Sequence, residues 1–512
     1  MRYYIGLDNG GTATKAAVFD ERGREIGTCG VATKAITPKP GFVERDMEEM
    51  WDANCAVLKG VLEKTGIDAG DVAGVGISGH GKGLYLWGKD DKPARNGIIS
   101  TDNRAYRYPL EWRANGVEEM AFHRSLQHIM ACQPTALLAW LRDNEPESYA
   151  NIKYVFECKD YIRFRLTGEA RAEVTDYSGS GLMNLWTVNF DQELLDMYGI
   201  PEVKDALPPT CRATEVCGYV TEEAAAKSGL KAGTPVIGGM FDINACAIAA
   251  GVTDPSKVCM IAGTWSINEY IRKEAVIDGR VQMNSCFALP GYYLIEESSP
   301  TSAGNFEWFI RELLPELKEK EKAAGGSIYD TVDRWVEEIP VTEFVPLFLP
   351  FLMASNVHPN AKACFLGMSV SHGRAHLARS IFEGITFCHK YHYERLMATR
   401  SEAPEVIRLA GGAARAKVWA QMFADVMNTP VQTREANETG ALGCAIAVAA
   451  ATGTYPSLDE AIKNMTVFSE PILPDPEAVA VYEKKYRLYK KALESLDGLW
   501  DDMQALVEGK YE

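Results

Sequence analysis

The sequence predicts an α/β fold made of two similar halves, and two observations carry this prediction. Alternating or apolar runs that are typical of strands give way to amphipathic segments that are typical of helices, and strands then return, which indicates layers of sheet and helix. A strand-turn-strand unit at residues 5–19 also recurs in outline at residues 258–271, with glycine and threonine at both turns. The boundary between the halves is expected near residues 244–256.

The first half is expected to open with an antiparallel meander. A short apolar run at residues 5–8 enters the turn 9–12, and a second alternating run leaves it. Asp46 and Glu49 form a capping pair ahead of an amphipathic helix. The strands expected in this half are residues 5–8, 13–19, 25–31, 72–78 and 83–87.

The pattern is expected to start again near the middle of the chain. A strand at residues 235–237 runs into a glycine pair, and a helix of small residues follows at 245–250. Residues 258–262 and 267–271 then form the second strand-turn-strand unit. Further along, a strand at residues 407–410 breaks into glycines before an amphipathic helix.

Composition limits the classes of function. The chain has 512 residues, of which 46% are hydrophobic and 24% charged, enough for two globular cores. Its 53 basic and 70 acidic residues give a net charge of −17, and the basic residues are scattered, which argues against a nucleic-acid partner. The 12 cysteines occur singly without a C-x-x-C motif, which favours reduced thiols and a cytoplasmic location. The apolar run 440–451 is too short to cross a membrane and predicts a buried helix.

The two repeated turns are suited to anions. Consecutive backbone N–H groups at Gly10 and Gly11, with the Thr12 hydroxyl, form a concavity that fits a phosphate. Gly263 and Thr264 offer the same groups in the second half, so two turns together suit a polyphosphate. Each turn taken alone is equally typical of a tight hairpin without a ligand.

Asp8 and Lys15 surround the first turn with charge. A carboxylate that ends an apolar strand beside an anion site is costly without a cation, and Mg²⁺ fits. Lys15 either neutralises phosphate charge or is a solvated strand residue, and both readings stay open. The glycines after residue 410 let a flat ring approach the backbone, although a plain strand-to-helix turn has the same pattern. Neither a G-x-x-x-x-G-K-[ST] loop nor a convincing dinucleotide fingerprint occurs in the sequence.

These residues resemble those of the FGGY carbohydrate kinases along nearly the whole chain. The most specific match is ACFLGM at 363–368, followed by HLARSIFE at 376–383, which is similar to the family's C-terminal signature. Other family-like passages are DNGGT at 8–12, KDY at 159–161, LTG at 166–168, GGMFD at 238–242, GT at 263–264 and GGA at 411–413. The resemblance implies two actin-like, RNase H-like domains, residues 1–245 and 246–512, around a deep interdomain cleft.

The resemblance also implies roles for individual residues. Asp242 is the expected catalytic base for the sugar hydroxyl, and Asp8 and Asp242 are the expected Mg²⁺ residues. Without the resemblance, Asp242 would be interpreted as the N-cap of the helix that follows it. The expected ATP contacts are Gly10, Gly11, Thr12, Lys15, Gly263, Thr264, Gly304, Gly411, Gly412, Ala413 and Lys417.

The acceptor is expected on the first domain. Polar candidates are His80, Lys82, Asp102 and Arg104, together with Asp242; Asp102 matches a family sugar-site aspartate, while the other three could be ordinary surface-loop residues. The passages GKGLYLWGKDDKP, SPTSAGNFEWF, GGMFD and GTWS are most similar to the L-xylulose kinase subgroup. This implies phosphorylation of a ketopentose, L-xylulose, at its terminal hydroxyl to give the 5-phosphate. His80, where that subgroup suggests glutamine, and Trp265, where the wider family often has serine, are departures.

Several alternatives stay open at this point. Other acceptors within the family are D-xylulose, ribulose, fuculose and erythritol. An actin-like ATP-binding module or a non-catalytic sugar sensor would share the fold, but the set Asp8, Thr12, Asp242 and Thr264 argues for catalysis. The expected partner is a small sugar, and neither a nucleic acid nor a membrane is expected. Formation of a homodimer is left as an open alternative.

Overall fold

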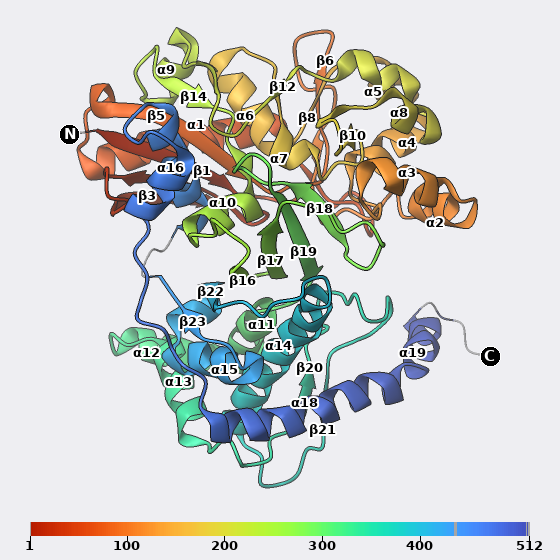
Figure 1. Cartoon of the computed structure of the whole chain (residues 1–512), viewed down its shortest axis with the longest axis vertical. Helices are drawn as coiled ribbons and strands as arrows, with labels where there is room; N and C mark the ends of the chain where they lie inside the picture. The colour runs from red at the N-terminus through yellow and green to blue at the C-terminus, as the bar shows by residue number, and fades with distance from the viewer. Residues whose placement is uncertain (1, 435–437, 508, 510–512) are drawn as a thin grey trace. The chain divides into compact units, whose positions relative to one another are not determined.

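The computed structural model describes residues 2–434, 438–507 and 509 (Figure 1). The chain divides into two compact units. The first contains Met1–Thr253, Ile271–Ile295 and Ala436–Val467, and the second contains Asp254–Tyr270, Glu296–Glu435 and Phe468–Glu512. Within the described ranges, no helix is both long and apolar enough to cross a membrane.

A seven-stranded sheet forms the centre of the first unit, in the order β13-β14-β5-β1-β2-β3, with β15 also paired to β5. The first strand is antiparallel to β2 and parallel to β5. The predicted N-terminal meander is confirmed. The strands are β1 (Tyr3–Asn9), β2 (Ala13–Phe19), β3 (Glu25–Ala32), β5 (Val72–Gly79), β13 (Val216–Tyr219), β14 (Pro235–Ile237) and β15 (Met240–Phe241).

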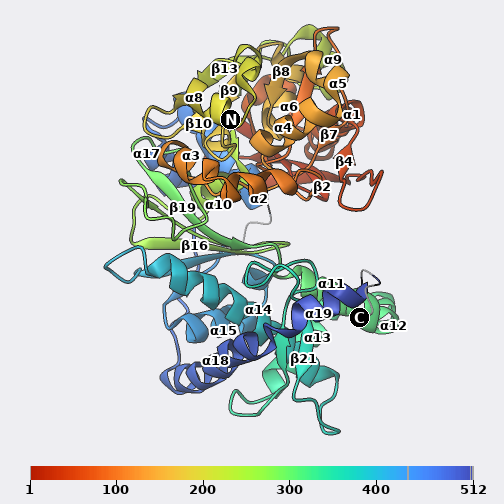
Figure 2. The same cartoon turned by 90° about the vertical axis from the view of Figure 1, so that its right-hand side faces the viewer.

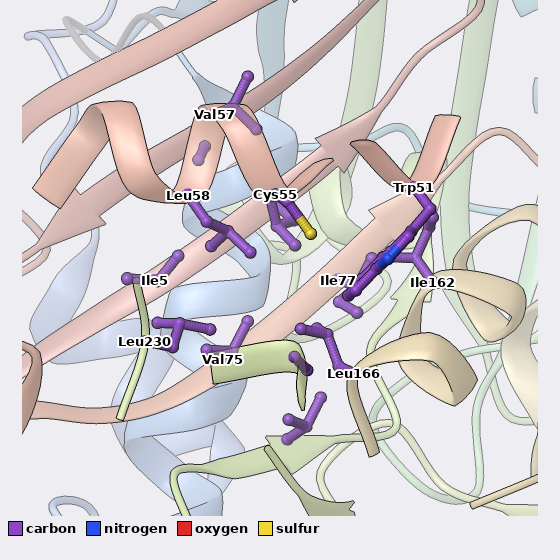
Figure 3. Packing of buried hydrophobic residues seen from close by; sticks show 14 of the residues in the cluster. Ile5, Trp51, Cys55, Val57, Leu58, Val75, Ile77, Ile162, Leu166 and Leu230 are labelled. Carbon is purple, nitrogen blue, oxygen red and sulfur yellow. The ribbon is translucent and has the colours of Figure 1, made fainter. Parts of the chain in front are cut away.

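Helix α1 covers one face of this sheet. Its N-cap is Asp46, whose side chain accepts hydrogen bonds from the backbone N–H groups of Glu48 and Glu49, as the capping pattern predicts. Its apolar side, including Trp51 and Leu58, packs with sheet residues such as Ile77 and with α6 in one buried cluster (Figure 3). The helices of the first unit are α1 (Met47–Thr65), α2 (Arg107–Ala114), α3 (Val117–Ser125), α4 (Pro134–Asn144), α5 (Pro146–Ala150), α6 (Cys158–Thr167), α7 (Val174–Tyr177), α8 (Gln192–Met197), α9 (Glu222–Ser228), α10 (Asp242–Ala249), α16 (Thr439–Ala451) and α17 (Leu458–Met465).

Helix α16 comes from the far end of the sequence and packs against β1, β5 and α10 (Figure 1). Glycine makes the close approach possible, because a Cβ added at Gly6 would lie 1.8 Å from the carbonyl oxygen of Ala441, and one added at Gly443 would lie 2.1 Å from that of Ala245. The expected buried helix at residues 440–451 is therefore confirmed, and it completes the core of the first unit.

Short two-stranded ladders complete the strands of the first unit. They pair β6 with β8, and through this pair Tyr85 stands opposite Phe156. The remaining strands of this unit are β4 (Glu44–Arg45), β6 (Tyr85–Gly88), β7 (Gly97–Ile98), β8 (Ile152–Phe156), β9 (Ala172–Glu173), β10 (Met183–Asn184), β11 (Asn189–Phe190), β12 (Thr210–Cys211) and β18 (Met283–Cys286).

The second unit contains a sheet that repeats the pairing of the first. The strand order of this six-stranded sheet is β18-β19-β17-β16-β22-β23, with β16 antiparallel to β17 and parallel to β22. This is the relation of β1 to β2 and β5, so the predicted repeat of the strand-turn-strand unit is confirmed. The strands are β16 (Lys257–Ala262), β17 (Ser266–Arg272), β19 (Tyr293–Ser299), β20 (Leu347–Leu349), β21 (Cys364–Leu366), β22 (Val406–Gly411) and β23 (Val431–Gln432).

Helices α14, α15 and α18 pack together in the second unit (Figure 2). Tyr482, Tyr486 and Tyr489 of α18 are buried, and all three rings contact Phe387 of α14, so they are packing residues. The helices are α11 (Gly304–Leu313), α12 (Pro315–Ala323), α13 (Ile328–Glu338), α14 (Arg374–Met397), α15 (Lys417–Met427), α18 (Pro476–Leu496) and α19 (Leu499–Val507).

Candidate functional site

The guanidinium of a buried arginine, Arg45, binds the carbonyl oxygens of the first turn. Arg45 Nη2 donates to the carbonyl oxygen of Gly11 at 2.8 Å and to Thr33 Oγ1 at 2.9 Å, and Nη1 reaches the carbonyl oxygen of Gly10 at 3.5 Å. The N–H of Gly10 donates to the carbonyl oxygen of Ala13 within the turn. This leaves the N–H groups of Gly11 and Thr12 as the candidates for an anion. Sequence reasoning missed Arg45, which is 2% exposed.

Asp8 lies one residue before the end of β1, and its burial disfavours the charged form of its carboxylate. Its Oδ1 accepts a hydrogen bond from Ser78 Oγ at 2.9 Å, and a Cβ added at Gly440, in the first turn of α16, would lie 2.9 Å from Asp8 Cγ. Burial raises the pKa of Asp8, and nearby Glu438 raises it further, while the Ser78 hydrogen bond and Lys15 lower it. A desolvated carboxylate of this kind fits a bound divalent cation, which would stabilise its ionised form.

Lys15 is paired. Its Nζ lies 3.0 Å from Glu438 Oε2 and 3.1 Å from Oε1, although the Lys15 side chain is 40% exposed. Lys15 stands opposite Asp8 in the β1–β2 register, so Glu438 places a second carboxylate beside this cross-strand pair. No local sequence pattern indicates Glu438, because it reaches Lys15 and Asp8 only through the return of α16 to the first unit.

Asp242 is the first residue of α10 and does not cap it. The N-cap is Phe241, and no side-chain cap is present, so the alternative interpretation of Asp242 as the N-cap is wrong. Gly238 and Gly239 lead the chain into β15, and a Cβ added at Gly239 (φ +73°) would lie 2.1 Å from the carbonyl oxygen of Ile77. The backbone that delivers Asp242 thus requires glycine at this point.

Strand register brings the two aspartates to one edge. Ser78 on β5 stands opposite Asp8 on β1 and opposite Met240 on β15, and both pairings are parallel. Across two strand spacings, the backbones at Asp8 and Met240 are about 10 Å apart. Asp242 follows Met240 by two residues, so both carboxylates lie where parallel strands end. This edge is the usual place for ligand contacts in such sheets.

His80 is a buried neutral histidine. It follows β5, its Nε2 pairs with the Tyr85 hydroxyl at 2.8 Å, and it is 5% exposed. Burial lowers the pKa of His80 to about 3, so the ring is uncharged at neutral pH. Lys82, two residues on, has a φ of +66°, and Gly83 N donates to the carbonyl oxygen of Cys132 at 2.6 Å. A surface-loop interpretation therefore does not hold for His80.

Asp102 and Arg104 form a closed network. Asp102 accepts from the backbone N–H of Val43 at 2.6 Å and from Arg104 Nη2 at 2.9 Å, and the same Nη2 reaches Glu44 Oε1 at 2.8 Å. The guanidinium lies over the ring of Phe42, with 4.4 Å from its carbon to the centroid. Asp102 is 3% exposed and Arg104 6%, so neither is a surface-loop residue. Both carboxylate oxygens of Asp102 accept hydrogen bonds within the protein, whereas Nη1 of Arg104 is buried and has no hydrogen-bond partner among the described residues.

A buried cluster of charged residues, which the sequence did not indicate, lies beside the His80–Gly83 loop. Lys159 Nζ lies 2.7 Å from Asp160 Oδ2 and 3.4 Å from both Glu173 Oε2 and Asp176 Oδ2. Burial, together with Asp176, raises the pKa of Glu157 well above its usual range. Among the described residues, neither carboxylate oxygen of Glu157 has a hydrogen-bond partner. The cluster beside the Lys82 loop therefore contains more carboxyl groups than ammonium groups.

In the second unit the structure brings the expected glycines together. Gly263 N donates to the carbonyl oxygen of Trp265 at 3.2 Å, which closes the β16–β17 turn. A Cβ added at Gly304, the first residue of α11, would lie 4.0 Å from the carbonyl oxygen of Thr264. One added at Gly412 would lie 3.8 Å from the carbonyl oxygen of Ala262. These contacts gather the β16–β17 turn, the start of α11 and the end of β22 around a small-residue surface.

Gly411 lies at this surface, whereas Lys417 lines a cavity whose lining includes none of these glycines. Gly411 has a φ of +85°, and a Cβ there would lie 2.4 Å from the carbonyl oxygen of Ala262, so the turn into the 3₁₀ segment Gly412–Arg415 requires glycine. Ala413 in that segment is fully buried. Lys417 begins α15 and lines a cavity of about 440 Å³ with Arg379 and Tyr482.

Comparisons with known proteins match two consecutive parts of the chain. Residues 3–249 match the model of the FGGY family of carbohydrate kinases, N-terminal domain, and residues 258–452 match that of the C-terminal domain. The L-xylulose/3-keto-L-gulonate kinase of Escherichia coli (strain K12) is 37% identical over 499 residues, which covers 97% of this chain and 98% of that protein. The probable L-xylulose kinase of Pasteurella multocida (strain Pm70) is 34% identical, covering 98% of this chain and all of that protein (100%).

Solved structures show the same architecture. The xylulose kinase of Rhodospirillum rubrum has a TM-score of 0.84 and 28% identity, covering 98% of this chain and 100% of that one. The ligand-bound xylulose kinase of Lactobacillus acidophilus has a TM-score of 0.87 and 25% identity, with the same coverage of 98% and 100%. The predicted α/β fold with two actin-like domains is confirmed.

Proposed function

This chain belongs to the FGGY family of carbohydrate kinases, and we propose that it transfers the γ-phosphoryl group of ATP to the terminal hydroxyl of a ketopentose. L-xylulose, giving L-xylulose 5-phosphate, is the first choice of acceptor. Support comes from the relatives in Escherichia coli and Pasteurella multocida, whose names include L-xylulose kinase at 37% and 34% identity over almost the whole chain.

The observation that carries the proposal is that Asp8 and Met240 both stand opposite Ser78, and that Asp242 follows Met240 by two residues. Phosphoryl transfer needs a cation near the phosphates and a carboxylate near the attacking hydroxyl. We assign Mg²⁺ to Asp8, whose buried charge fits a cation, with Asp242 as the second expected residue. The ion would neutralise phosphate charge when bound.

Asp242 takes the role of general base. Its carboxylate accepts the proton of the acceptor hydroxyl while the hydroxyl oxygen forms the new bond to the γ-phosphorus and the bond to the leaving ADP oxygen breaks. Its partial exposure, at the first residue of α10, leaves the side chain accessible to a hydroxyl. The products are the sugar phosphate and ADP, with the proton held on Asp242 until solvent takes it.

The donor is assigned to the glycine turns. In the first unit, Gly11 and Thr12 offer N–H groups to phosphate, with Gly10 and Lys15 beside them. In the second unit, we assign the nucleotide to Gly263, Thr264, Gly304, Gly411, Gly412 and Ala413, which the structure gathers together. Lys417 stays a prediction, as do a homodimer, a cytoplasmic location and a domain boundary at residues 245–246.

The acceptor is assigned to the loop that contains Lys82. His80 offers an uncharged ring, and the Asp102–Arg104 network holds the segment 42–44 in place. Buried polar side chains of this kind distinguish sugar acceptors by the arrangement of their hydroxyl groups. A sugar with a mismatched hydroxyl leaves a polar group of the site without a hydrogen-bond partner.

The test is ATP turnover, measured by coupled ADP release, across a panel of acceptors. The panel contains L-xylulose, D-xylulose, L- and D-ribulose, L-fuculose, glycerol, erythritol and a six-carbon keto acid of the kind named for the E. coli relative, with a control lacking sugar. We expect the highest kcat/KM with L-xylulose. Preference for D-xylulose or a ribulose would keep the ketopentose assignment and overturn the choice of L-xylulose, and preference for fuculose, a polyol or the keto acid would overturn the ketopentose assignment. No stimulation by any acceptor would favour an ATP-binding module or a sugar sensor.

A further inference from the structure

Three side chains in the second unit form a continuous hydrogen-bonded chain. Ser302 Oγ lies 3.0 Å from His389 Nε2, and His389 Nδ1 lies 2.9 Å from Asn268 Oδ1. The residues come from the segment before α11, from α14 and from β17. All three are 0% exposed. Nothing in the sequence motifs pointed to this group, since its members are far apart along the chain.

The orientation of the Asn268 amide determines which atom donates in each of these hydrogen bonds. Its Nδ2 donates to the carbonyl oxygen of Glu297 at 3.1 Å, so its Oδ1 is the atom that faces His389. Burial lowers the pKa of His389 to about 3, and the neighbouring His392 lowers it too, so the ring is neutral. A neutral imidazole with a hydrogen on Nδ1 accepts at Nε2. The hydroxyl of Ser302 therefore donates to His389, and His389 donates to Asn268.

The Ser302–His389–Asn268 order looks like that of a nucleophilic triad, but burial excludes that role. A nucleophile needs a substrate atom within hydrogen-bond reach, and none of these side chains has exposed surface. His389 is also enclosed on the side of α15, where the ring of Phe423 lies 5.2 Å away in an edge-on contact. The chain of hydrogen bonds must therefore act through the backbone segments that it connects.

One end of the chain reaches the β16–β17 turn. Asn268 Nδ2 also approaches Ser266 Oγ at 3.5 Å, and Ser266 is the residue directly after Gly263, Thr264 and Trp265. Asn268 and Ser266 lie on the same strand, so fixing the Asn268 side chain fixes the strand that leaves the turn. Both residues are 0% exposed.

The other end reaches the start of α11. Ser302 precedes Gly304 by two residues, and Asn305 Nδ2 donates to the carbonyl oxygen of Ser302 at 2.8 Å and to Thr301 Oγ1 at 2.7 Å. Gly304 in turn lies against the carbonyl oxygen of Thr264, where an added Cβ would be 4.0 Å away. His389 thus ties together the two segments whose spacing defines the small-residue surface assigned to the nucleotide.

We propose that His389 is a positioning residue for nucleotide binding, which holds the Gly263–Ser266 turn and the start of α11 at the separation that ATP requires. The inference rests on the proposed assignment of the nucleotide to these segments. Loss of the imidazole would leave the Ser302 hydroxyl and Oδ1 of Asn268 without their buried partner, and the two segments would shift to satisfy them.

The test compares His389→Asn with Ser302→Ala in the full-length chain. Asn keeps a donor near the Nδ1 position and loses the partner of Ser302, so both variants break the same link. We expect the Kd for ATP, measured by calorimetry without sugar, to rise about tenfold in each, which corresponds to about 1.4 kcal/mol. KM for ATP should rise in parallel while KM for the sugar stays within about twofold. The double variant should be no worse than either single one.

A matched control lies one turn along α14. His392 is 1% exposed, and its Nδ1 lies 3.3 Å from Glu297 Oε2, so His392→Asn removes an equally buried imidazole. It should lower the melting temperature without changing the Kd for ATP. Unchanged ATP binding in folded His389→Asn, or equal weakening in His392→Asn, would overturn the positioning role alone. A wild-type chain that bound no ATP would instead remove the proposed nucleotide site, and the inference with it.

Discussion

The ammonium of Lys15 lies 3.0 Å from the carboxylate of Glu438, and both groups act on the charge of Asp8. Glu438 raises the pKa of Asp8 and Lys15 lowers it, apart from the larger effect of burial. If Asp8 must be ionised to act, the acidic limb of the pH profile reports its pKa.

Two substitutions should move that limb in opposite directions. Glu438→Gln removes a neighbour that raises the pKa of Asp8, so the limb of kcat/KM for ATP should move to lower pH. Lys15→Met removes a neighbour that lowers it, so the limb should move to higher pH. The profiles are measured at saturating sugar and constant free Mg²⁺. Shifts in the same direction for both variants would exclude Asp8 as the titrating group.

Asp242→Asn tests the base. The substitution keeps the shape of the side chain and removes its ability to take a proton, so kcat should fall about 100- to 10,000-fold. The Kd for ATP, measured by calorimetry, should stay within about twofold of the wild type, because the change lies on the acceptor side of the reaction. A variant that retained a substantial part of kcat would assign the proton to another group.

Gly440→Ala tests how closely α16 approaches Asp8. The new methyl would lie 2.9 Å from the Asp8 carboxylate carbon, so the carboxylate or the helix must shift. A displacement on this scale can lower kcat/KM about 100-fold. Gly373→Ala is the matched control, because a Cβ there meets nothing within 4 Å and its φ is −99°. Steady-state kinetics of the two variants give the comparison, and equal activity would mean that the position of Asp8 is not critical.

Arg104→Met tests the buried network. The substitution leaves the Asp102 carboxylate enclosed without its cation, and breaking a buried pair in this way costs about 3 to 5 kcal/mol of unfolding free energy. Arg113→Met removes an arginine whose side chain is 57% exposed beside Glu118, so it should cost less than about 1 kcal/mol. Urea unfolding measures both. The KM for sugar should rise in Arg104→Met while the KM for ATP stays constant, and the reverse pattern would move Arg104 to the nucleotide side.

The parts of the fold that were predicted correctly from the sequence depend on local residue patterns. The hairpin around Gly10, the cap at Asp46 and the second turn at Gly263 each depend on residues close together in the chain, and all three are found where they were expected. Likewise, the strand before Gly411 and the helix after it follow from apolar spacing and glycine alone.

The remaining features depend on contacts between distant segments. Asp102 stays a predicted sugar residue, and a sequence motif does not reveal its partners within the protein, which are the backbone of Val43 and the guanidinium of Arg104. Glu438 reaches Lys15 only because α16 returns to the first unit. His389 belongs to no motif and acquires its place from the packing of α14.

The return of α16 has a consequence for synthesis on the ribosome. The face of the first sheet that carries Gly6 is not covered by α16 until residues 439–451 have emerged, long after residue 253. At typical elongation rates the delay is roughly 10 to 40 seconds. The nascent N-terminal half therefore exposes apolar surface during this interval. A fragment that ends near residue 250 should bind chaperones or aggregate rather than fold.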